Sequence, residues 1–150
     1  LTQGTTALET AVVNDINTAN LRVQAEINMV SSKQVGLLTR VSGDAADPSF
    51  YLGYLLRTSN GIRAEIWRKQ VTEAVASWKL LGYTTTTKDS GLMSFDAQNG
   101  TFTLSIDGEQ LLSANEPLFG EADIPQSGSA GTWLKGILGS SVDDFAIYSI

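Results

Sequence analysis

The sequence contains no cysteine and no histidine. Without cysteine there are no disulfides, iron–sulfur clusters or thiol nucleophiles. Without either residue there are no His- or Cys-ligated zinc or haem sites and no Ser-His-Asp or Cys-His triads. The chemistry left to this chain is that of carboxylates, lysine or tyrosine, oxygen-ligated calcium, or binding without catalysis.

Positive charge is also scarce, because 10 Lys and Arg residues stand against 16 Asp and Glu residues, for a net charge of -6. Nucleic-acid binders normally present a basic patch, so we expect no nucleic acid as partner. No apolar run approaches the roughly 18 residues of a membrane-spanning helix, and we expect no membrane insertion. With 150 residues, 42% of them hydrophobic, the chain is predicted to form one globular domain.

The N-terminal segment differs from the rest of the chain. Its first ten residues lack the basic stretch followed by an apolar stretch that marks a secretory leader, so we expect a mature product, an excised domain or a part of a longer chain. Residues 1–20 are predicted to be an N-terminal extension or a segment leading into the first strand, with a short helix or an irregular strand over 6–17. Residues 21–150 are predicted to form one β-sandwich domain.

Alternation of apolar and polar residues is the dominant pattern. In residues 21–30, Leu21, Val23, Ala25, Ile27 and Met29 fall on one face of a strand and the polar residues between them fall on the other. Residues 101–106 repeat the pattern. Strands are also predicted over 34–41, 50–57, 62–68, 74–81 and 142–149. Residues 70–77 are expected to turn a corner into the strand that follows.

Short turn sequences separate these strands. Asn60-Gly61 and Asp107-Gly108 each lie between two strand-like segments and predict two-residue hairpins, whose type I′ turns need positive φ. Asn99-Gly100 predicts a third tight turn. Many short strands joined by turns indicate an all-β fold, and specifically an antiparallel β-sandwich.

The order of these segments resembles a known family. The segments that carry the resemblance are VGLLTRV (35–41), FYLGYLL (50–56), GTFTLSIDGEQLL (100–112) and VDDFAIYSI (142–150). Over residues 20–150 they are similar to the concanavalin A-like lectin/glucanase superfamily, and most to its laminin G-like jelly-roll domains. The resemblance implies a jelly-roll sandwich whose last strand lies beside the first long one.

Glucanases of this superfamily carry a pair of carboxylates on one strand, and a retaining mechanism needs the two carboxyl groups about 5–5.5 Å apart. Glu26 and Glu65 lie in predicted strands, but neither has a second carboxylate at the required spacing. Asp143 and Asp144 are adjacent, so on a strand they point to opposite faces. The prediction is that the chain is not an enzyme.

A ligand-binding face is the first candidate site. Its predicted residues, placed on the outward side of the sheet, are Tyr51, Arg57, Arg63, Glu65 and Trp67. Aromatic rings next to charged and amide groups suit sugars, because the CH groups of a sugar stack on a ring while its hydroxyls need fixed donors and acceptors. The alternative is that these side chains form an ordinary mixed surface, with Trp67 covered by a loop. Trp78 and Trp133 are predicted to lie in the core.

Calcium is the second candidate. Laminin G-like relatives often hold Ca²⁺ at the rim of the sandwich, and Asp44 and Asp47 lie in one short loop. Since Ca²⁺ prefers six to eight oxygen ligands, backbone carbonyls or water would have to complete such a site. Acidic loops are also simply good turn formers. Apart from calcium, no cofactor is expected.

Two functions remain open. The first is a non-catalytic recognition module, carbohydrate-binding, at a cell or particle surface. The alternative is a structural or adhesive domain of an assembly such as a phage virion, for example a capsid decoration, head-fibre or tail-associated protein. The expected partner is a glycan in the first case and a partner protein in the second, and an oligomer is compatible with both. The expected location is extracellular or surface-exposed, or else the virion.

Overall fold

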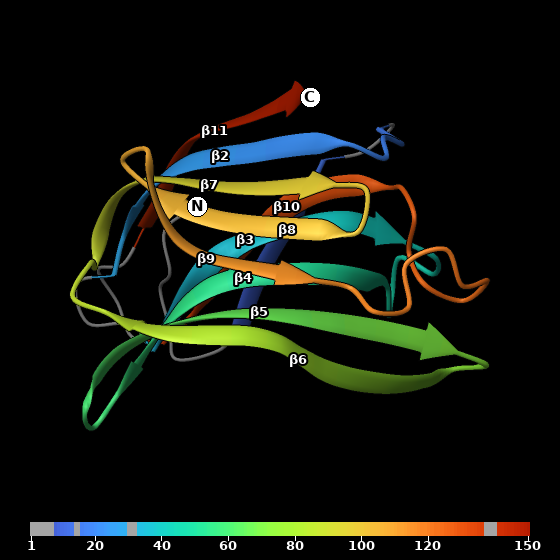
Figure 1. Ribbon diagram of the computed structural model, residues 1–150, viewed down its shortest axis with the longest axis horizontal. Coiled ribbons are helices and arrows are strands. Elements are labelled where there is room, and N and C mark those ends of the chain that lie inside the picture. Colours follow the sequence, from blue (N-terminus) through green and yellow to red (C-terminus); the bar gives the residue numbers. More distant parts are fainter. Residues whose placement is uncertain (1–7, 14–15, 30–32, 137–140) are drawn as a thin grey trace.

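Two antiparallel sheets packed face to face make up the computed structural model, which describes residues 8–13, 16–29, 33–136 and 141–150 (Figure 1). The six-stranded sheet contains, in order, β1 (Leu8–Val12), β10 (Ser129–Lys135), β3 (Gln34–Ser42), β4 (Ser49–Thr58), β5 (Gly61–Thr72) and β6 (Val75–Thr86). The five-stranded sheet contains β11 (Ser141–Ser149), β2 (Leu21–Asn28), β7 (Ser90–Gln98), β8 (Thr101–Ile106) and β9 (Glu109–Asn115). The predicted all-β, antiparallel sandwich is confirmed.

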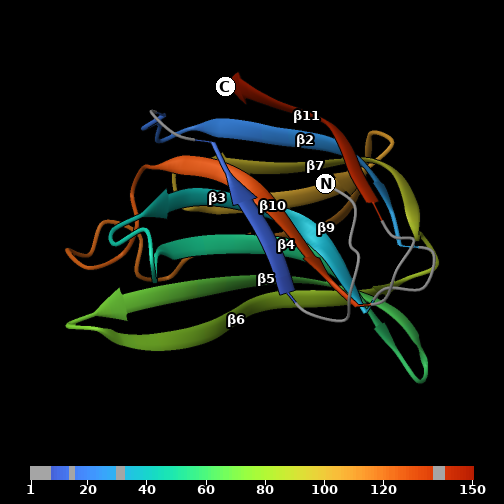
Figure 2. The same cartoon turned by 180° about the vertical axis from the view of Figure 1, so that it is seen from behind.

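The two sheets are best followed in opposite views. Figure 1 looks from the side of the five-stranded sheet, and Figure 2 looks from behind, onto the six-stranded sheet, where β1 lies across β10. The last strand, β11, pairs with β2 as the family resemblance implied. Two strands fall outside the predicted segments, namely β7 and β10. In the described part of the chain, no helix is long and apolar enough to cross a membrane.

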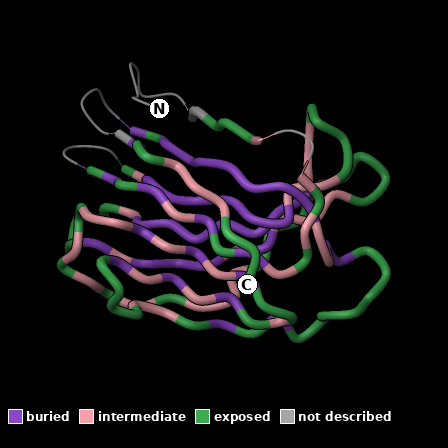
Figure 3. Tube along the Cα trace, turned by 90° about the horizontal axis from the view of Figure 1, so that it is seen from above, coloured by how far each residue is buried: buried purple, intermediate pink, exposed green. Residues whose placement is uncertain are grey.

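The core lies between the sheets and follows the alternation of the sequence. In β2 the residues from Leu21 to Ile27 alternate between buried and more exposed, as predicted. Phe95 and Phe102 of the five-stranded sheet meet Tyr51 and Leu55 of β4, all four fully buried. Figure 3 shows the buried segments running through the strands while the exposed segments gather at the turns. Burial of this apolar face is the main force that holds the two sheets together.

The turns confirm part of the prediction and correct another part. Asp107 and Gly108 have φ of 51° and 80° between β8 and β9, which is the predicted type I′ hairpin. Residues 70–77 do not turn a corner. They form the end of the long β5–β6 hairpin, where Glu73 and Ala74 adopt φ of 51° and 63° in a tight turn. The apolar residues at 71, 74 and 75 have the spacing of a helix face, but the pairing of two long strands overrides that local preference.

The segment 1–20 contributes to the sandwich. β1 pairs with β10 from Leu8 opposite Lys135 to Val12 opposite Gly131, and it forms one edge of the six-stranded sheet. Further along, Thr18 and Gly128 exchange a pair of backbone hydrogen bonds. The described part of this segment is therefore held against β10 and the loop before it.

Charged side chains bridge the two sheets inside the sandwich. The Glu116 carboxylate, which is buried, accepts a hydrogen bond from Arg68 Nη1 at 2.6 Å and another from the Tyr51 hydroxyl at 3.1 Å. Arg40 is also fully buried and donates to the backbone carbonyls of Ala19 and Asn99 at 3.0 and 2.6 Å. Because a buried charge without partners is costly, these contacts fix how the sheets sit on one another.

Gly53 offers a test of this packing. It faces the core from β4, and a Cβ there would lie 2.8 Å from Phe95 Cδ1. Gly53→Ala is therefore expected to lower the free energy of unfolding by about 1–3 kcal/mol, since an overpacked core must shift. The loss of stability is measured by urea denaturation, in which the slope of the unfolding free energy against urea concentration should be the same for the variant and the original protein. The control is Gly82→Ala, whose Cβ would lie 3.3 Å from Ala114 Cβ. If both variants lost the same stability, the contact with Phe95 would not be the cause.

A candidate binding face on the six-stranded sheet

Strand β4 carries apolar side chains on both of its faces. Tyr51 and Leu55 point into the core, while Phe50, Leu52 and Tyr54 form part of a separate buried cluster on the outer face of the six-stranded sheet. We call this outer surface the aromatic face. Besides those three it comprises Leu38, Trp133 and Trp67, together with Trp78 against their rings. The described part of the five-stranded sheet does not cover it, because that sheet packs on the opposite side.

Trp78 is the centre of this cluster. Its ring lies edge-on to Phe50 at 5.7 Å, to Trp67 at 6.3 Å and to Trp133 at 6.3 Å between centroids. Trp78 comes from β6 and Trp133 from β10, and three strands lie between them in the sheet. Rings from strands so far apart meet only if the sheet curls, since neighbouring strands are about 4.8 Å apart. The aromatic face is therefore concave.

A cleft of about 360 Å³ opens among these rings. It is lined by Leu52, Tyr54, Trp67, Trp78 and Trp133, with Gln34 and Lys135 supplying polar groups. Between Tyr54 and Trp133 the sheet has Gly36, where a Cβ would lie 2.4 Å from Tyr54 Cβ. The missing side chain leaves room beside β3 for the Cβ of Tyr54, whose hydroxyl reaches Glu65 on β5. Trp78 remains 46% exposed, so the cleft presents an aromatic surface to solvent.

The Glu65 carboxylate organises the polar part of the aromatic face. Its Oε1 accepts hydrogen bonds from the Tyr54 hydroxyl at 2.7 Å and from Trp67 Nε1 at 2.9 Å. Its Oε2 forms an ion pair with Arg63 Nη2 at 2.8 Å. Arg63 in turn lies over the ring of Tyr83, with its Cζ 4.2 Å from the ring centroid. A single buried carboxylate thus fixes the positions of two aromatic side chains and one cation.

Two lysines lie at the edges of the cluster. The Lys69 ammonium group lies 5.3 Å from the centre of the Phe50 ring and pairs with Asp47 Oδ1 at 2.5 Å. Lys135 is exposed and lines the cleft. On the same side, Trp133 Nε1 donates to Gln34 Oε1 at 2.8 Å, which leaves the Gln34 amide nitrogen to donate elsewhere. The cleft therefore combines flat apolar walls with a few oriented donors, the combination that holds a polyhydroxylated ring.

The structure brings together three of the predicted ligand residues. Arg63, Glu65 and Trp67 alternate along the outer side of β5 and are joined by the contacts of Glu65. The outward placement of Tyr51 is wrong. Its side chain is fully buried between the sheets, stacked on Phe102 at 4.1 Å. Because both faces of β4 are apolar, alternation alone could not decide which residues point outward.

Arg57 also lies apart from the aromatic face. It stands opposite Ile62, which belongs to the core between the sheets, so this pair of positions faces the inner side of the sheet at its end. Its side chain is exposed to solvent there. The structure therefore leaves Arg57 outside the cluster around Glu65.

Sequence reasoning placed Trp78 and Trp133 in the core. Trp78 is instead half exposed, whereas Trp133 is buried, but in the cluster on the outer face rather than between the sheets. Trp78 does share a face with Leu80, as expected, but the partners across the sheet are Lys69 and Trp67 of the outer side. A bulge between Ile66 and Trp67 in the pairing with β6 then turns Leu81 toward the core. Trp133 is only 8% exposed, and it packs within the outer cluster. The pairing of Trp78 with Lys69 across the β5–β6 hairpin was the signal that could have assigned Trp78 to the outer face.

The two carboxylates of the predicted calcium loop already make contacts within the protein. Asp44 Oδ1 accepts a hydrogen bond from the Ala46 amide at 2.9 Å, the usual role of an aspartate in a turn. Asp47 pairs with Lys69, so an ammonium group already occupies one of its oxygens. Among the described residues there is no group of three or more acidic side chains that could hold a metal ion. Asp44 and Asp47 as they stand do not fit a calcium site.

One pair of carboxylates meets across strands rather than along one. Asp143 of β11 stands opposite Glu26 of β2, and both are exposed. They lie on the outer side of the five-stranded sheet, because the alternate residues Val23, Ala25 and Ile27 of β2 face the core. This pair is therefore on the other side of the molecule from the aromatic face.

No family model matches the sequence, and no curated protein matches it. Solved structures do. The carbohydrate-binding module CBM66 from Bacillus subtilis superposes with a TM-score of 0.70 at 12% identity, covering 95% of this chain and 82% of that one. Sheep galectin-11, in a complex with glycerol, gives 0.59 at 8% identity, with 97% and 99% covered.

A family 16 glycoside hydrolase, an endo-glucanase from Bacteroides ovatus, gives a TM-score of 0.58 at 8% identity over 83% of this chain and 59% of that one. At such identities the likeness establishes the fold. The chain therefore shares the jelly-roll β-sandwich fold of these structures, which is the fold that the family resemblance implied.

We predict that the buried tyrosines make the fold less stable at alkaline pH. Burial, helped by Glu65, raises the pKa of Tyr54 above its usual range, and burial, helped by Glu116, does the same for the pKa of Tyr51. Their contribution to stability is complete below about pH 10, where the unfolded phenols ionise, and is lost as the pH rises further. Above that pH, each tyrosine lowers the free energy of unfolding by up to about 1.4 kcal/mol per pH unit.

Urea unfolding measured from pH 9 to pH 11.5 checks this expectation. The slope of stability against pH should become less steep in Tyr54→Phe, because one of the buried phenols is gone. An identical slope in the variant and the original protein would show that Tyr54 ionises as easily in the folded state as in the unfolded one.

Proposed function

We propose that this chain is a non-catalytic carbohydrate-binding module whose sugar lies on the aromatic face. The observation that carries the proposal is the open cleft between Trp67, Trp78 and Trp133, with Trp78 46% exposed on a concave sheet. Exposed aromatic clusters of this size are unusual on a protein surface unless they bind something. The named carbohydrate-binding module and the galectin among similar structures support a glycan as the ligand.

The contacts of the cleft suit the two kinds of surface on a sugar ring. Its CH groups would stack on Trp67 and Trp78. Glu65 already accepts two hydrogen bonds on Oε1 and forms an ion pair with Arg63 through Oε2, and since a carboxylate has about four acceptor sites, acceptor capacity remains for a hydroxyl of the ligand. Gln34 and Lys135 offer donors from the other side of the cleft. The polar groups are held in place before the ligand arrives, which reduces the entropy lost on binding.

The same geometry supports binding without hydrolysis. Glycoside hydrolysis ordinarily uses two carboxyl groups that flank the bond to be cleaved. Among the described residues lining the cleft there is no carboxylate, and Glu65 beside it is held by a tyrosine, a tryptophan and an arginine. A glycan-binding role also favours an extracellular or surface-exposed location. A structural domain in an assembly such as a virion stays a prediction.

Trp78→Ala tests the proposal. Removal of the central ring is expected to weaken glycan binding by about 2 kcal/mol or more, roughly 30-fold, because aromatic anchors dominate such sites. Binding is measured on a glycan array and then by calorimetry with the glycans that bind. The thermal midpoint is expected to change little, since Trp78 is half exposed.

Tyr148→Ala is the matched control, because Tyr148 is a 50% exposed aromatic residue on the five-stranded sheet. It should bind as tightly as the original protein. Absence of binding to every glycan on the array, or equal binding by Trp78→Ala and the original protein, would sink the proposal.

Glu65→Gln tests the positioning role of the carboxylate. The amide keeps the size of the side chain but loses the charge that pairs with Arg63 and one of the acceptor oxygens. We expect weaker glycan binding by roughly tenfold, in the range of a lost charged hydrogen bond. Near-ultraviolet circular dichroism, which reports ring orientation, should change as well. Unchanged affinity together with a changed spectrum would show that Glu65 orients rings the ligand does not use.

A further inference from the structure

We infer that the binding site continues along β5 from the cleft into a second pocket, so that its ligand is an uncharged oligosaccharide rather than a single sugar. This inference rests on the proposed function and names the class of ligand. It joins two cavities at different places on the six-stranded sheet through one row of side chains.

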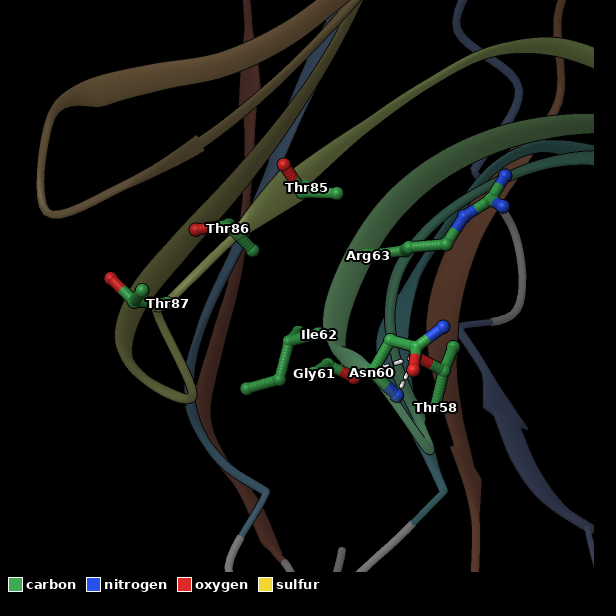
Figure 4. A pocket seen from close by; sticks show the side chains of 8 residues that line it. All are labelled: Thr58, Asn60, Gly61, Ile62, Arg63, Thr85, Thr86 and Thr87. Atoms are coloured by element: carbon green, nitrogen blue, oxygen red, sulfur yellow. Dashed lines mark hydrogen bonds between the residues drawn. The ribbon is translucent and has the colours of Figure 1, made fainter.

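The second pocket has a volume of about 640 Å³ and lies at one end of the six-stranded sheet. One wall is the β4–β5 hairpin, with residues 58 and 60–63, and the other is the end of β6 with the residue after it, 85–87. Figure 4 shows the threonines at 85–87 across the gap from Asn60 and Gly61. Figure 2 shows the tip of this hairpin extending beyond the edge of the sheet.

A continuous row of outward side chains joins the pocket to the cleft. Along β5 the outer positions are Trp67, Glu65 and Arg63, and residues two apart on a strand are about 6.6–7 Å from each other. Trp67 therefore lies roughly 13 Å from Arg63 along the strand, which exceeds one sugar ring. On β6, Tyr83 stands opposite Glu65 and Thr85 opposite Arg63, so the row is two strands wide.

Arg63 belongs to both regions. It lines the second pocket, pairs with Glu65 and lies over the ring of Tyr83, which is 59% exposed. Its Nε is buried and makes no hydrogen bond to any described residue. The Arg63 side chain as a whole is 34% exposed, so a ligand in the pocket can contact it. Tyr83 offers the flat surface that an intermediate sugar would stack on.

The chemistry of the pocket favours an uncharged ligand. Its polar side chains are threonine hydroxyls and the Asn60 amide, Ile62 adds an apolar surface, and the charge of its one described ionic residue, Arg63, is balanced by Glu65. In the described part of the chain, the hydroxyls of Thr85 and Thr87 have no recorded hydrogen-bond partner, whereas Thr86 accepts from the Lys88 amide. Hydroxyls and amides bind the hydroxyls of a neutral sugar without the cost of removing a charge from water.

The test is a length series. Calorimetry is carried out with cello-, laminari-, xylo-, galacto- and fructo-oligosaccharides, each from the disaccharide to the hexasaccharide, and with the double variant Thr85→Val/Thr87→Val. Valine keeps the shape of threonine and its preference for strands while it removes the hydroxyl. In at least one series the affinity of the original protein should rise with length. The double variant should lose roughly 2- to 10-fold in affinity for the longest members only, as expected for lost hydrogen bonds.

Thr103→Val is the control, because Thr103 lies on β8 in the other sheet and its loss should affect no ligand. Equal affinity for all lengths, with no effect of the double variant, would overturn the extended site while leaving the proposed function intact. Failure of every oligosaccharide to bind would instead overturn the proposed function. Tighter binding of a carboxylated or sulfated analogue than of the neutral sugar of the same length would contradict the uncharged class.

Discussion

Apolar packing on both faces of β4 is the constraint on which the rest of this structure depends. One face closes the core against Phe95 and Phe102, and the other supports the rings of the aromatic face. A strand buried on both sides is normally a central strand of a sheet covered by protein on each face. Here the described part of the chain covers only one of the two faces of β4. The second apolar face is left open by the described chain, and it is the face on which we propose that a glycan binds.

The outer face is kept open by polar contacts rather than by further burial. Glu65 holds Tyr54, Trp67 and Arg63 in fixed positions, so the rings cannot collapse onto each other and fill the cleft. Beneath the sheet, Glu116 holds Arg68, the next residue after Trp67, from the inner side. The same short stretch of β5 is therefore anchored on both faces by a carboxylate. Such a stretch has little freedom to rearrange on binding.

Sequence alone predicted the fold class because alternation is a local signal. β2 and β8 each have one apolar face, and for these strands the inner and outer residues follow directly from the pattern. The same rule could not orient β4, and it misplaced Tyr51. The site also depends on facts of pairing. The bulge opposite Trp67 and the curl that brings Trp78 to Trp133 arise only when distant strands meet.

The chain has three tryptophans in all, and the structure places them in one cluster with neighbouring ring centres 6.3 Å apart. Light absorbed at the red edge of the protein spectrum, and the fluorescence that follows, therefore come from the proposed site alone. No indole elsewhere in the fold dilutes the signal. Occupancy of the site is thus open to observation in the unmodified protein, without a label, at the wavelength where only these rings emit.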